Sequence, residues 1–222
     1  MNKWLDICVN AYIDNFGKTE KPIVWDVGSR DGDDGAELFN RISGINPDEN
    51  LVLIEASPIQ AELCRTNYPR AITIECAIDE KNGVRKFLSV YNPNNIEASG
   101  TSSLNTLHKE TKHPDAQLET INVETRRLDS LIPKNQAIDI MKIDIEQYSW
   151  QALQSLGDRL KDVKVFHIET ETDLIKDVMH PDWHNNIEIR EFMEDNGFIF
   201  VGKDNEWGEG IEDQVYVNGA LL

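Results

Sequence analysis

The chain has 222 residues, of which 40% are hydrophobic and 28% charged, so it can bury one sizeable core. Its formal net charge of -18 disfavours binding to nucleic acid or to an anionic membrane surface, because both carry dense negative charge. We therefore expect one α/β domain over residues 1–222, with no nucleic-acid partner and no membrane insertion. The oligomeric state does not follow from these numbers.

The three cysteines, Cys8, Cys64 and Cys76, are odd in number and form neither a CxxC pair nor a Cys/His metal spacing. Thiols used as small apolar residues are typical of a reducing compartment, so we expect a cytoplasmic protein. Residues 1–17 carry apolar side chains at helical spacing, without the uninterrupted apolar stretch of an export signal. We expect an amphipathic helix that packs on the domain. A lid over a substrate pocket is the alternative.

Further along the chain, short β-rich runs alternate with helical patterns, which is typical of a parallel sheet with crossover helices. The runs that we predict as its parallel strands are residues 23–28, 51–56, 71–78, 138–145 and 163–169. The helical patterns that we predict between and after them are residues 35–44, 57–68 and 190–197. The order of these elements predicts helices on both faces of the sheet.

The middle and the end of the chain follow other patterns. Residues from about 80 to 137 are expected to form an irregular insert or a substrate-side region. Within it, 84–90 and 121–128 resemble strands, and the polar stretch 92–115 predicts a loop over one face. Residues 198–206 and 213–218 predict an antiparallel pair of strands at the edge of the sheet.

The loop after the first predicted strand reads "VWDVGSRDGDDG" and lies where open α/β sheets bind ligands. Gly28, Gly32 and Gly35 follow the spacing GxxxGxxG, whereas dinucleotide-binding loops follow GxGxxG. Three aspartates in this loop would also repel a pyrophosphate at the start of the next helix. The loop therefore favours a cofactor with positive charge, such as S-adenosylmethionine. An NAD-dependent sugar-modifying enzyme is the less favoured alternative.

The aspartates of this loop have several possible uses. Residues 31–35 begin the pattern of a calcium loop but lack its third ligand and its bidentate glutamate, so we exclude an EF-hand. Asp33 and Asp34 are expected to complement the positive end of the following helix. Asp26 and Gly28, at the strand end itself, are better candidates for cofactor contact. Glu55 ends the second strand, where an acidic side chain typically accepts hydrogen bonds from both hydroxyls of a ribose.

The fourth predicted strand leads into the unusual string "DIMKIDIEQYSW", residues 139–150. Alternation places Asp144 and Glu146 on the same side as Lys142, with the last residues protruding from the buried strand. A carboxylate there could orient a methyl donor, accept a proton from a substrate hydroxyl, or bind a divalent ion. The alternative is an internal ion pair between Lys142 and a carboxylate, which would stabilise only the strand end.

Five stretches of the chain resemble, in their order and spacing, the successive motifs of one enzyme family. These stretches are "VWDVGSRDG", "LVLIEASP", "TSSL", "RRLDSLI" and "IDIMKIDIEQYSW". They resemble the FkbM-type family of class I S-adenosylmethionine-dependent methyltransferases, from about residue 22 to residue 170. The resemblance implies a Rossmann-like, mostly parallel seven-stranded sheet with an antiparallel C-terminal edge hairpin. It also implies O-methylation of a hydroxyl on a sugar, glycan or natural-product acceptor.

The resemblance also assigns residues by position. Those expected to bind S-adenosylmethionine are Asp26, Gly28, Ser29, Arg30, Gly32, Glu55, Ala56, Ala77, Ile78 and Asp144. The chain departs from the family pattern at Ser29 and Arg30, where Ala-Asn is usual. It departs again at Gln147 and Ser149, where a glycine and a second glutamate are usual. A noncatalytic S-adenosylmethionine-binding or partner-binding domain is therefore the alternative function.

Methyl transfer requires alignment of donor and acceptor and help in removing the hydroxyl proton. The candidates that we select for this catalytic work are Asp144, Glu146 and His184. The stretch 180–186, "HPDWHNN", combines two imidazoles with Trp183, which could stack on a sugar. Its alternative use is the entry of a helix, capped by Asn185 or Asn186.

Two further possibilities concern the fifth predicted strand. His167 lies inside its apolar run, where a histidine is more often a satisfied core residue. A magnesium ion could be held at the strand ends by Asp144 with Glu169 or Glu171.

Overall fold

The computed structural model describes residues 3–92, 101–104, 117–179, 183–205 and 208–222. Its main sheet has seven strands in the order β3-β2-β1-β7-β8-β10-β9. The parallel strands are β1 (Val24–Val27), β2 (Leu51–Glu55), β3 (Ile72–Glu75), β7 (Ile138–Ile143) and β8 (Val163–Glu171). The antiparallel edge is formed by β9 (Phe198–Asp204) and β10 (Ile211–Asn218). The predicted fold class is confirmed.

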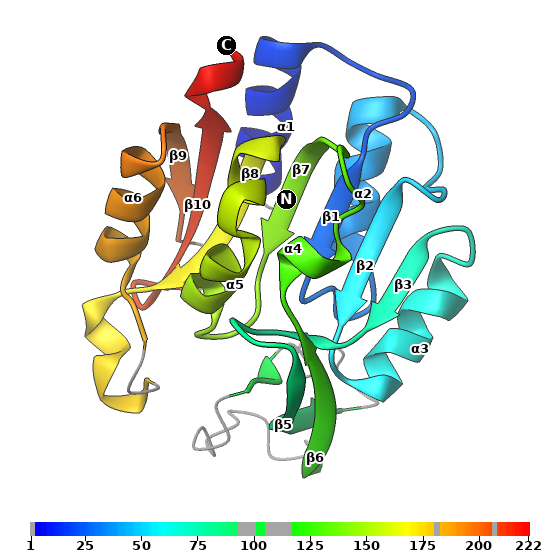
Figure 1. Cartoon of the computed structure of the whole chain (residues 1–222), viewed down its shortest axis with the longest axis vertical. Helices are drawn as coiled ribbons and strands as arrows, with labels where there is room; N and C mark the ends of the chain where they lie inside the picture. Colours follow the sequence, from blue (N-terminus) through cyan, green and yellow to red (C-terminus); the bar gives the residue numbers. More distant parts are fainter. Residues whose placement is uncertain (1–2, 93–100, 105–116, 180–182, 206–207) are drawn as a thin grey trace.

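Helices cover both faces of the main sheet (Figure 1). One apolar core lies between the sheet and the helices α1 (Lys3–Phe16), α2 (Asp33–Ser43) and α3 (Pro58–Asn67). A second core lies against α4 (Leu128–Leu131), α5 (Ser149–Leu156) and α6 (Asn186–Asp195). Short 3-10 helices include η2 (Gly157–Asp162), η3 (Asp173–Val178) and η4 (Gly219–Leu221).

The central strands are apolar because both of their faces are covered. In β1, Val24 belongs to one core, whereas Trp25 and Val27 belong to the other. All six residues of β7 are buried, as expected for a parallel strand between two layers of helices. Charged residues within these strands, such as Lys142, must therefore find partners inside the protein.

The first helix, α1, lies over the main sheet and buries one apolar stripe. Its buried side chains are Trp4, Leu5, Cys8, Val9 and Tyr12. Tyr12 donates a hydrogen bond of 2.9 Å from its hydroxyl to Asp139 Oδ1 at the start of β7. None of the helices in the described part of the chain is long and apolar enough to cross a membrane.

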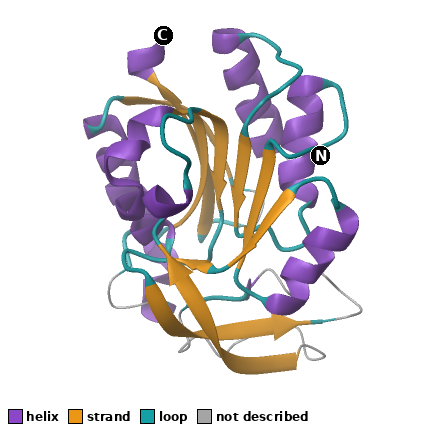
Figure 2. Cartoon of the chain, turned by 45° about the vertical axis from the view of Figure 1, so that its right-hand side comes forward, coloured by secondary structure: helices purple, strands orange, loops and turns teal. Residues whose placement is uncertain are grey.

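A second, smaller sheet lies beyond the carboxyl ends of β1, β2 and β7 (Figure 2). It contains β4 (Ala77–Ile78), β6 (Gln117–Arg126) and β5 (Gly83–Tyr91), in that order. The predicted single strand 71–78 is divided at Cys76. Up to Glu75 the chain pairs with β2, and from Ala77 it pairs with β6, so it passes from one sheet to the other.

Candidate functional site

Four parallel strands bring their carboxyl ends to the same edge of the main sheet. Val27 at the end of β1 lies in register with Ile54 of β2 and with Ile143 of β7, which in turn pairs with Ile168 of β8. The loops after these strands are therefore neighbours. They carry most of the residues that the sequence predicts for the site.

The loop after β1 approaches the chain after β7 very closely. Gly28 has a φ of 85°, and a Cβ added to it would lie 1.8 Å from the backbone oxygen of Asp144. Arg30 and Gly32 also adopt left-handed conformations, with φ of 54° and 89°. Ser29 is buried and donates a hydrogen bond of 2.6 Å from its hydroxyl to the Asp26 carbonyl. We expected Gly28 to let the backbone approach a ligand, and the structure shows that it makes room for Asp144.

The Glu55 carboxylate joins the loops after β1 and β2. Its Oε2 accepts a hydrogen bond of 2.8 Å from the Arg30 amide, and its Oε1 accepts one of 2.8 Å from the Ser57 amide. Burial raises the pKa of Glu55 to about 7, although these backbone bonds oppose the shift. Each carboxylate oxygen has a second lone pair, so the fixed carboxylate can still accept hydrogen bonds from a ligand.

Lys142 lies in β7, and its buried ammonium is shared by three carboxylates. Its Nζ lies 3.0 Å from Asp144 Oδ2, 3.3 Å from Asp26 Oδ1 and 3.6 Å from Asp34 Oδ2. The alternative that we considered for this strand, an internal ion pair, is therefore present. Burial would raise the pKa of Asp144, but the nearby Lys142 ammonium holds this pKa below its usual value. The Asp144 side chain is 29% exposed, so it keeps its charge and also reaches the surface.

Asp26 has an internal position. Its side chain is fully buried, and its Oδ2 accepts a hydrogen bond of 3.1 Å from the Gly35 amide in the first turn of α2. Burial raises the pKa of Asp26 to about 6, and Lys142 opposes the shift. This burial differs from our expectation that Asp26 lines the cofactor loop. The carboxylate holds α2 and Lys142 in place beneath that loop.

The turn after β7 keeps a left-handed geometry although the family glycine is missing. Glu146 and Gln147 have φ of 46° and 72°. The Gln147 amide donates a hydrogen bond of 2.7 Å to Glu171 Oε1, and the Ser103 hydroxyl of the "TSSL" motif donates one of 2.8 Å to the Glu146 carbonyl. Ser149, which replaces the second family glutamate, donates one of 2.8 Å to the Glu169 carbonyl. Neighbouring segments thus hold the turn.

Several carboxyl groups gather around this turn. Burial, together with the charges of Asp144 and Glu171, raises the pKa of Glu146 well above its usual value. Burial and neighbouring carboxylates also raise the pKa of Glu169, and burial raises that of Glu171 to about 7. Within the described ranges, no three or more His, Cys, Asp or Glu side chains are grouped so that they could hold a metal ion. The pairs considered for magnesium from the sequence, Asp144 with Glu169 or with Glu171, are not part of such a larger group.

Three expected cofactor residues lie where the two sheets meet. Ala77 and Ile78 are buried in β4, and Ala56 packs against the small core that contains Ala77 and Tyr148. Tyr148 ends the turn after β7. The segments after β2, β3 and β7 are therefore in contact at this point.

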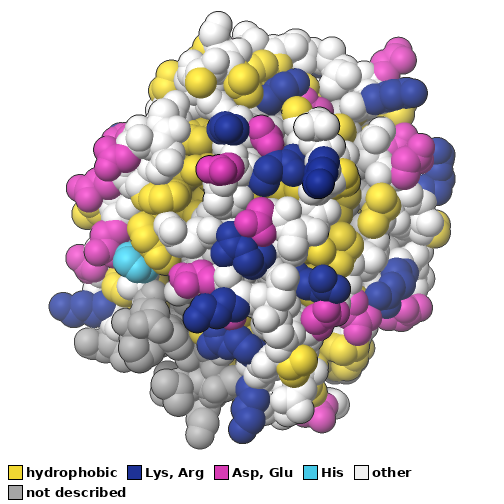
Figure 3. All heavy atoms as spheres, viewed as in Figure 1, with side chains coloured by type: hydrophobic (Ala, Val, Ile, Leu, Met, Phe, Trp, Pro, Cys, Tyr) yellow, Lys and Arg dark blue, Asp and Glu magenta, His cyan; other side chains and the backbone are white. Residues whose placement is uncertain are grey.

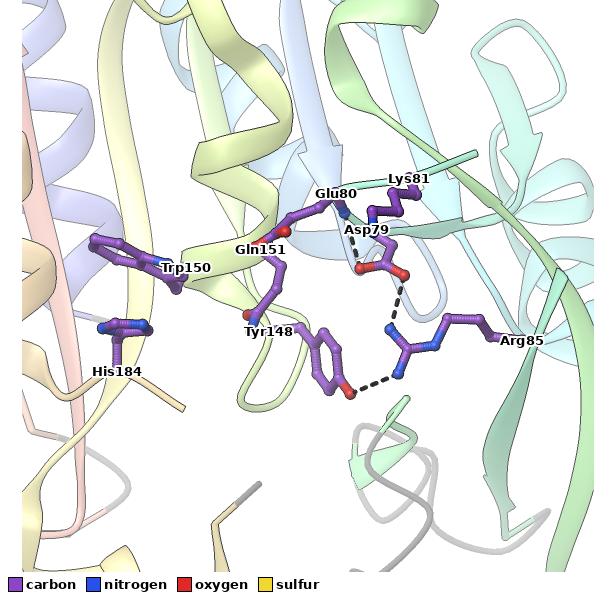
Figure 4. Close-up of a pocket in the computed structure, with 8 residues that line it drawn as sticks. All are labelled: Asp79, Glu80, Lys81, Arg85, Tyr148, Trp150, Gln151 and His184. Carbon is purple, nitrogen blue, oxygen red and sulfur yellow. Dashed lines mark hydrogen bonds and ion pairs between the residues drawn. The ribbon is translucent and has the colours of Figure 1, made fainter. Parts of the chain in front are cut away.

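A cavity of about 410 Å³ opens next to this junction (Figure 4). Its lining residues are Asp79, Glu80, Lys81, Arg85, Tyr148, Trp150, Gln151 and His184. Arg85 Nη1 donates to Asp79 Oδ2 at 2.8 Å, and Nη2 donates to the Tyr148 hydroxyl at 3.4 Å. On the opposite side, the rings of Trp150 and His184 stack with centroids 3.9 Å apart.

The sequence identified one wall of this cavity but missed the other. His184 was expected at the site, and Tyr148 and Trp150 belong to the motif that we singled out. Asp79 and Arg85 belong to the second sheet and its connection, which had no recognisable motif. The sequence signal that could have identified Asp79 and Arg85 is their opposite charge, six residues apart on either side of a turn.

His167 and Asn185 also have clear positions in the structure. His167 is buried, its Nε2 lies 2.8 Å from Asp213 Oδ1, and its ring stacks on Trp4 at 4.0 Å. It is a core residue, as we interpreted it. Asn185 caps α6, because its side chain accepts hydrogen bonds from the amides of Ile187 and Glu188. His180 lies outside the described residues, and Trp183 donates from its indole to Glu171 Oε2 at 3.3 Å.

With this geometry established, comparison with known proteins gives one decisive match. Residues 26–200 match the family model of the FkbM methyltransferase domain. The chain belongs to the FkbM methyltransferase family. This FkbM domain includes the Glu55 and Lys142 clusters and both walls of the cavity, whereas α1 precedes the matched region.

Solved structures share the fold of this FkbM domain at low sequence identity. TrmK of M. capricolum, in complex with S-adenosyl-homocysteine, is 9% identical with a TM-score of 0.51, over 99% of this chain and 69% of that chain. The magnesium protoporphyrin IX methyltransferase of Synechocystis PCC 6803 is 11% identical with a TM-score of 0.50, over 96% and 81%. A protein of the NADB-Rossmann superfamily from Streptococcus agalactiae is 12% identical with a TM-score of 0.51, over 99% and 69%. No curated protein matches the sequence significantly. The fold is Rossmann-like, of the class I methyltransferase type.

Proposed function

We propose that this FkbM domain is an S-adenosylmethionine-dependent methyltransferase that methylates a hydroxyl on a sugar, glycan or natural-product acceptor. The observation that carries this proposal is the position of two acidic side chains around one glycine loop. Glu55 ends β2 and binds the Arg30 amide of the loop, while Asp144 follows β7 with its backbone against Gly28. This arrangement supports Glu55 as the acceptor of the ribose hydroxyls and Asp144 as a group near the methionine end of the cofactor.

The charges around the loop fit S-adenosylmethionine better than a dinucleotide. Lys142 carries one positive charge, whereas Asp26, Asp34 and Asp144 bring three carboxylates to it. The formal excess of negative charge attracts a cation and repels a pyrophosphate. The residues that we propose to hold the cofactor are Gly28, Ser29, Arg30, Gly32, Glu55, Ala56, Ala77, Ile78 and Asp144. When bound, the cofactor supplies an electrophilic methyl group on a sulfonium.

Among the acidic candidates, Asp144 is the best suited to contact an acceptor hydroxyl. It is partly exposed, and its lowered pKa keeps it ionised, so it can accept a hydrogen bond and orient the hydroxyl. The same lowered pKa makes it a weak base. The raised pKa of Glu146 favours its neutral form. His184, on the wall of the cavity, is then the remaining candidate to take the hydroxyl proton.

The cavity has the composition of a site for a polar ring. Trp150 and His184 offer an aromatic wall, and Asp79, Arg85 and Gln151 offer polar groups on the other walls. A polyhydroxylated acceptor could stack on the aromatic wall and exchange hydrogen bonds with the polar ones. Because Lys81 and Arg85 are offset by Asp79 and Glu80, the cavity favours a neutral acceptor over a polyanion.

A noncatalytic cofactor-binding domain is the second candidate. Ser149 stands where the family has a second glutamate, and its hydroxyl is engaged with the Glu169 carbonyl. A domain that has lost a catalytic carboxylate could retain cofactor binding. It would bind S-adenosylmethionine without transferring the methyl group.

Calorimetry with S-adenosylmethionine and S-adenosylhomocysteine tests the cofactor site. Replacing Glu55 by glutamine removes charge-assisted hydrogen bonds to the ribose, so we expect affinity to fall about 10- to 150-fold, or roughly 1.5 to 3 kcal/mol. Glu75→Gln is the matched control, because Glu75 lies beside Glu55 at the end of β3 but is exposed and pairs with Arg65 at 2.9 Å. We expect the affinity of this control to stay unchanged.

Two results would count against this assignment. Unchanged affinity in a folded Glu55→Gln variant would remove Glu55 from the ribose site. Failure of the parent protein to bind either ligand would contradict the proposed function as a whole. Thermal melting of each variant shows whether it is folded.

A further inference from the structure

The ammonium of Lys142 connects three elements that surround the proposed cofactor site. Its carboxylate partners come from β1 (Asp26), from the first turn of α2 (Asp34) and from the end of β7 (Asp144). Lys142 is only 2% exposed and lies in register with Asp26 on β1. A charge that is this deeply buried requires opposite charges around it, and the three carboxylates supply them.

The three partners differ in their access to solvent. Asp26 is fully buried, whereas Asp34 and Asp144 are 26% and 29% exposed. Asp144 is also the partner whose backbone lies against Gly28 of the proposed cofactor loop. Lys142 therefore lies behind Asp144, with no open path to a ligand, and its charge acts on the site through that carboxylate.

The other basic groups that act on Asp144, Arg30 and His167, already have acidic partners. Arg30 lies 3.4 Å from Asp31, and His167, which is in register with Lys142 on β8, binds Asp213. Lys142 is thus the cation that contacts Asp26, Asp34 and Asp144 within the described residues. One positive and three negative charges leave two negative charges uncompensated in a formal count.

We propose that Lys142 is a positioning residue that fixes Asp144 and sets how strongly the site prefers a cationic ligand over its neutral-sulfur counterpart. This inference rests on the proposed function. Methyl transfer converts S-adenosylmethionine, with a sulfonium, into S-adenosylhomocysteine, with a neutral thioether. The two ligands share every other group, so the ratio of their affinities measures the electrostatic potential at the sulfur. Lys142 lowers this ratio because it offsets part of the carboxylate charge.

Two substitutions change the charge around Asp144 in opposite directions. Lys142→Met removes the cation, so we expect the preference for S-adenosylmethionine over S-adenosylhomocysteine to rise about threefold or more. Asp34→Asn removes one carboxylate, so we expect the same preference to fall about two- to threefold. A purely structural role would change both affinities by the same factor and would leave their ratio constant.

Asp33→Asn is the matched control for Asp34→Asn. Asp33 is the preceding residue in the first turn of α2, but its carboxylate accepts a hydrogen bond of 2.7 Å from the Tyr68 hydroxyl and does not contact Lys142. The substitution therefore removes the same charge from the same helix end. We expect the ratio of the two affinities to stay at the parent value.

The measurement is calorimetric titration of each variant with both ligands at low salt and at pH 8, which is above the raised pKa of Asp26. A ratio that rises in Lys142→Met and falls in Asp34→Asn supports the proposal. A ratio equal to the parent value in both would overturn it. If Lys142→Met does not fold, the comparison of Asp34→Asn with Asp33→Asn decides alone. A parent protein that binds neither ligand would refute the proposed function, and this inference with it.

Discussion

Asp144 takes part in an internal ion pair and also reaches the surface of the proposed site. Asp144→Asn keeps the shape of the side chain but removes its charge. If the carboxylate orients the acceptor hydroxyl, turnover should fall about a hundredfold or more while the protein still folds. If the residue only pairs with Lys142, the melting temperature should fall and turnover per folded molecule should stay nearly intact. Turnover and thermal melting, measured on the same preparation, separate these outcomes.

The sequence predicted part of this cluster. Alternation along β7 placed Lys142 and Asp144 on one side, and the structure agrees. Asp26 and Asp34 contact the Lys142 ammonium because of the register between β1 and β7 and the packing of α2. Neither the register nor the packing can be predicted from a single sequence. The left-handed Gln147 was also unexpected, because nothing local favours φ of 72° for glutamine. Hydrogen bonds to Glu171 and from Ser103, which are distant in sequence, hold that turn.

The close approach of the loops after β1 and β7 leads to a prediction about stability. Gly28→Ala would place a methyl group 1.8 Å from the Asp144 carbonyl oxygen, so the two loops must separate. Gly44→Ala is the control, because Gly44 has a similar φ of 74° but no atom within 4 Å of the added group. We expect Gly44→Ala to lower the free energy of unfolding by about 1 to 2 kcal/mol, from backbone strain alone. Gly28→Ala should lower the free energy of unfolding by clearly more than Gly44→Ala does.

Urea unfolding of both variants measures this difference. Equal losses of stability would show that the two loops are not in the contact that the structure describes. The same experiment bears on ligand binding, because separation of the loops would move Asp144 away from Glu55. The Gly28 variant should therefore also bind S-adenosylhomocysteine less tightly than the Gly44 variant.

The main sheet could be predicted from the sequence more fully than the second sheet. The parallel strands are short apolar runs between helices, and this pattern is local. Pairing of β5 with β6 joins Tyr91 to Gln117 across a long polar stretch, so no turn signal marks it. The break at Cys76 was hidden because residues on both sides are β-formers. The cavity needs both sheets, and only its α5 side could be anticipated.

For the whole molecule, the buried carboxyl groups predict how stability depends on pH. The folded protein raises the pKa of Glu55 and Glu171 to about 7 and that of Asp26 to about 6, above their ordinary values. Between about pH 4.5 and pH 7 the folded state therefore binds more protons than the unfolded state. The free energy of unfolding should fall as pH rises through this window, by at least about 2 kcal/mol.

Urea unfolding at several pH values from 5 to 8 checks this expectation. Asp144 has a lowered pKa, so its contribution makes the free energy of unfolding rise with pH. This contribution is confined to more acidic pH. Glu171→Gln should make the free energy of unfolding depend less on pH, because it removes one of the carboxyl groups with a raised pKa. A free energy of unfolding that increased steadily up to pH 8 would contradict the internal burial of these carboxyl groups.

The charge of the molecule also bears on its acceptor. At a net charge of -18, the chain should repel polyanions and therefore prefer neutral or cationic acceptors. Figure 3 shows one face, on which basic side chains lie beside acidic ones. Ion pairs such as Arg127–Asp129, at 2.6 Å, offset part of the positive charge of the chain. Salt should therefore have little effect on the reaction.

Transfer of a labelled methyl group from S-adenosylmethionine to a panel of glycans, lipids, polyketides and RNA tests the proposed chemistry most directly. We predict label on a hydroxyl of a neutral or cationic acceptor, with little loss when salt is added. Absence of transfer by a protein that binds the cofactor would leave the noncatalytic domain as the better description. Strong labelling of RNA that falls steeply with salt would contradict the proposed acceptor class.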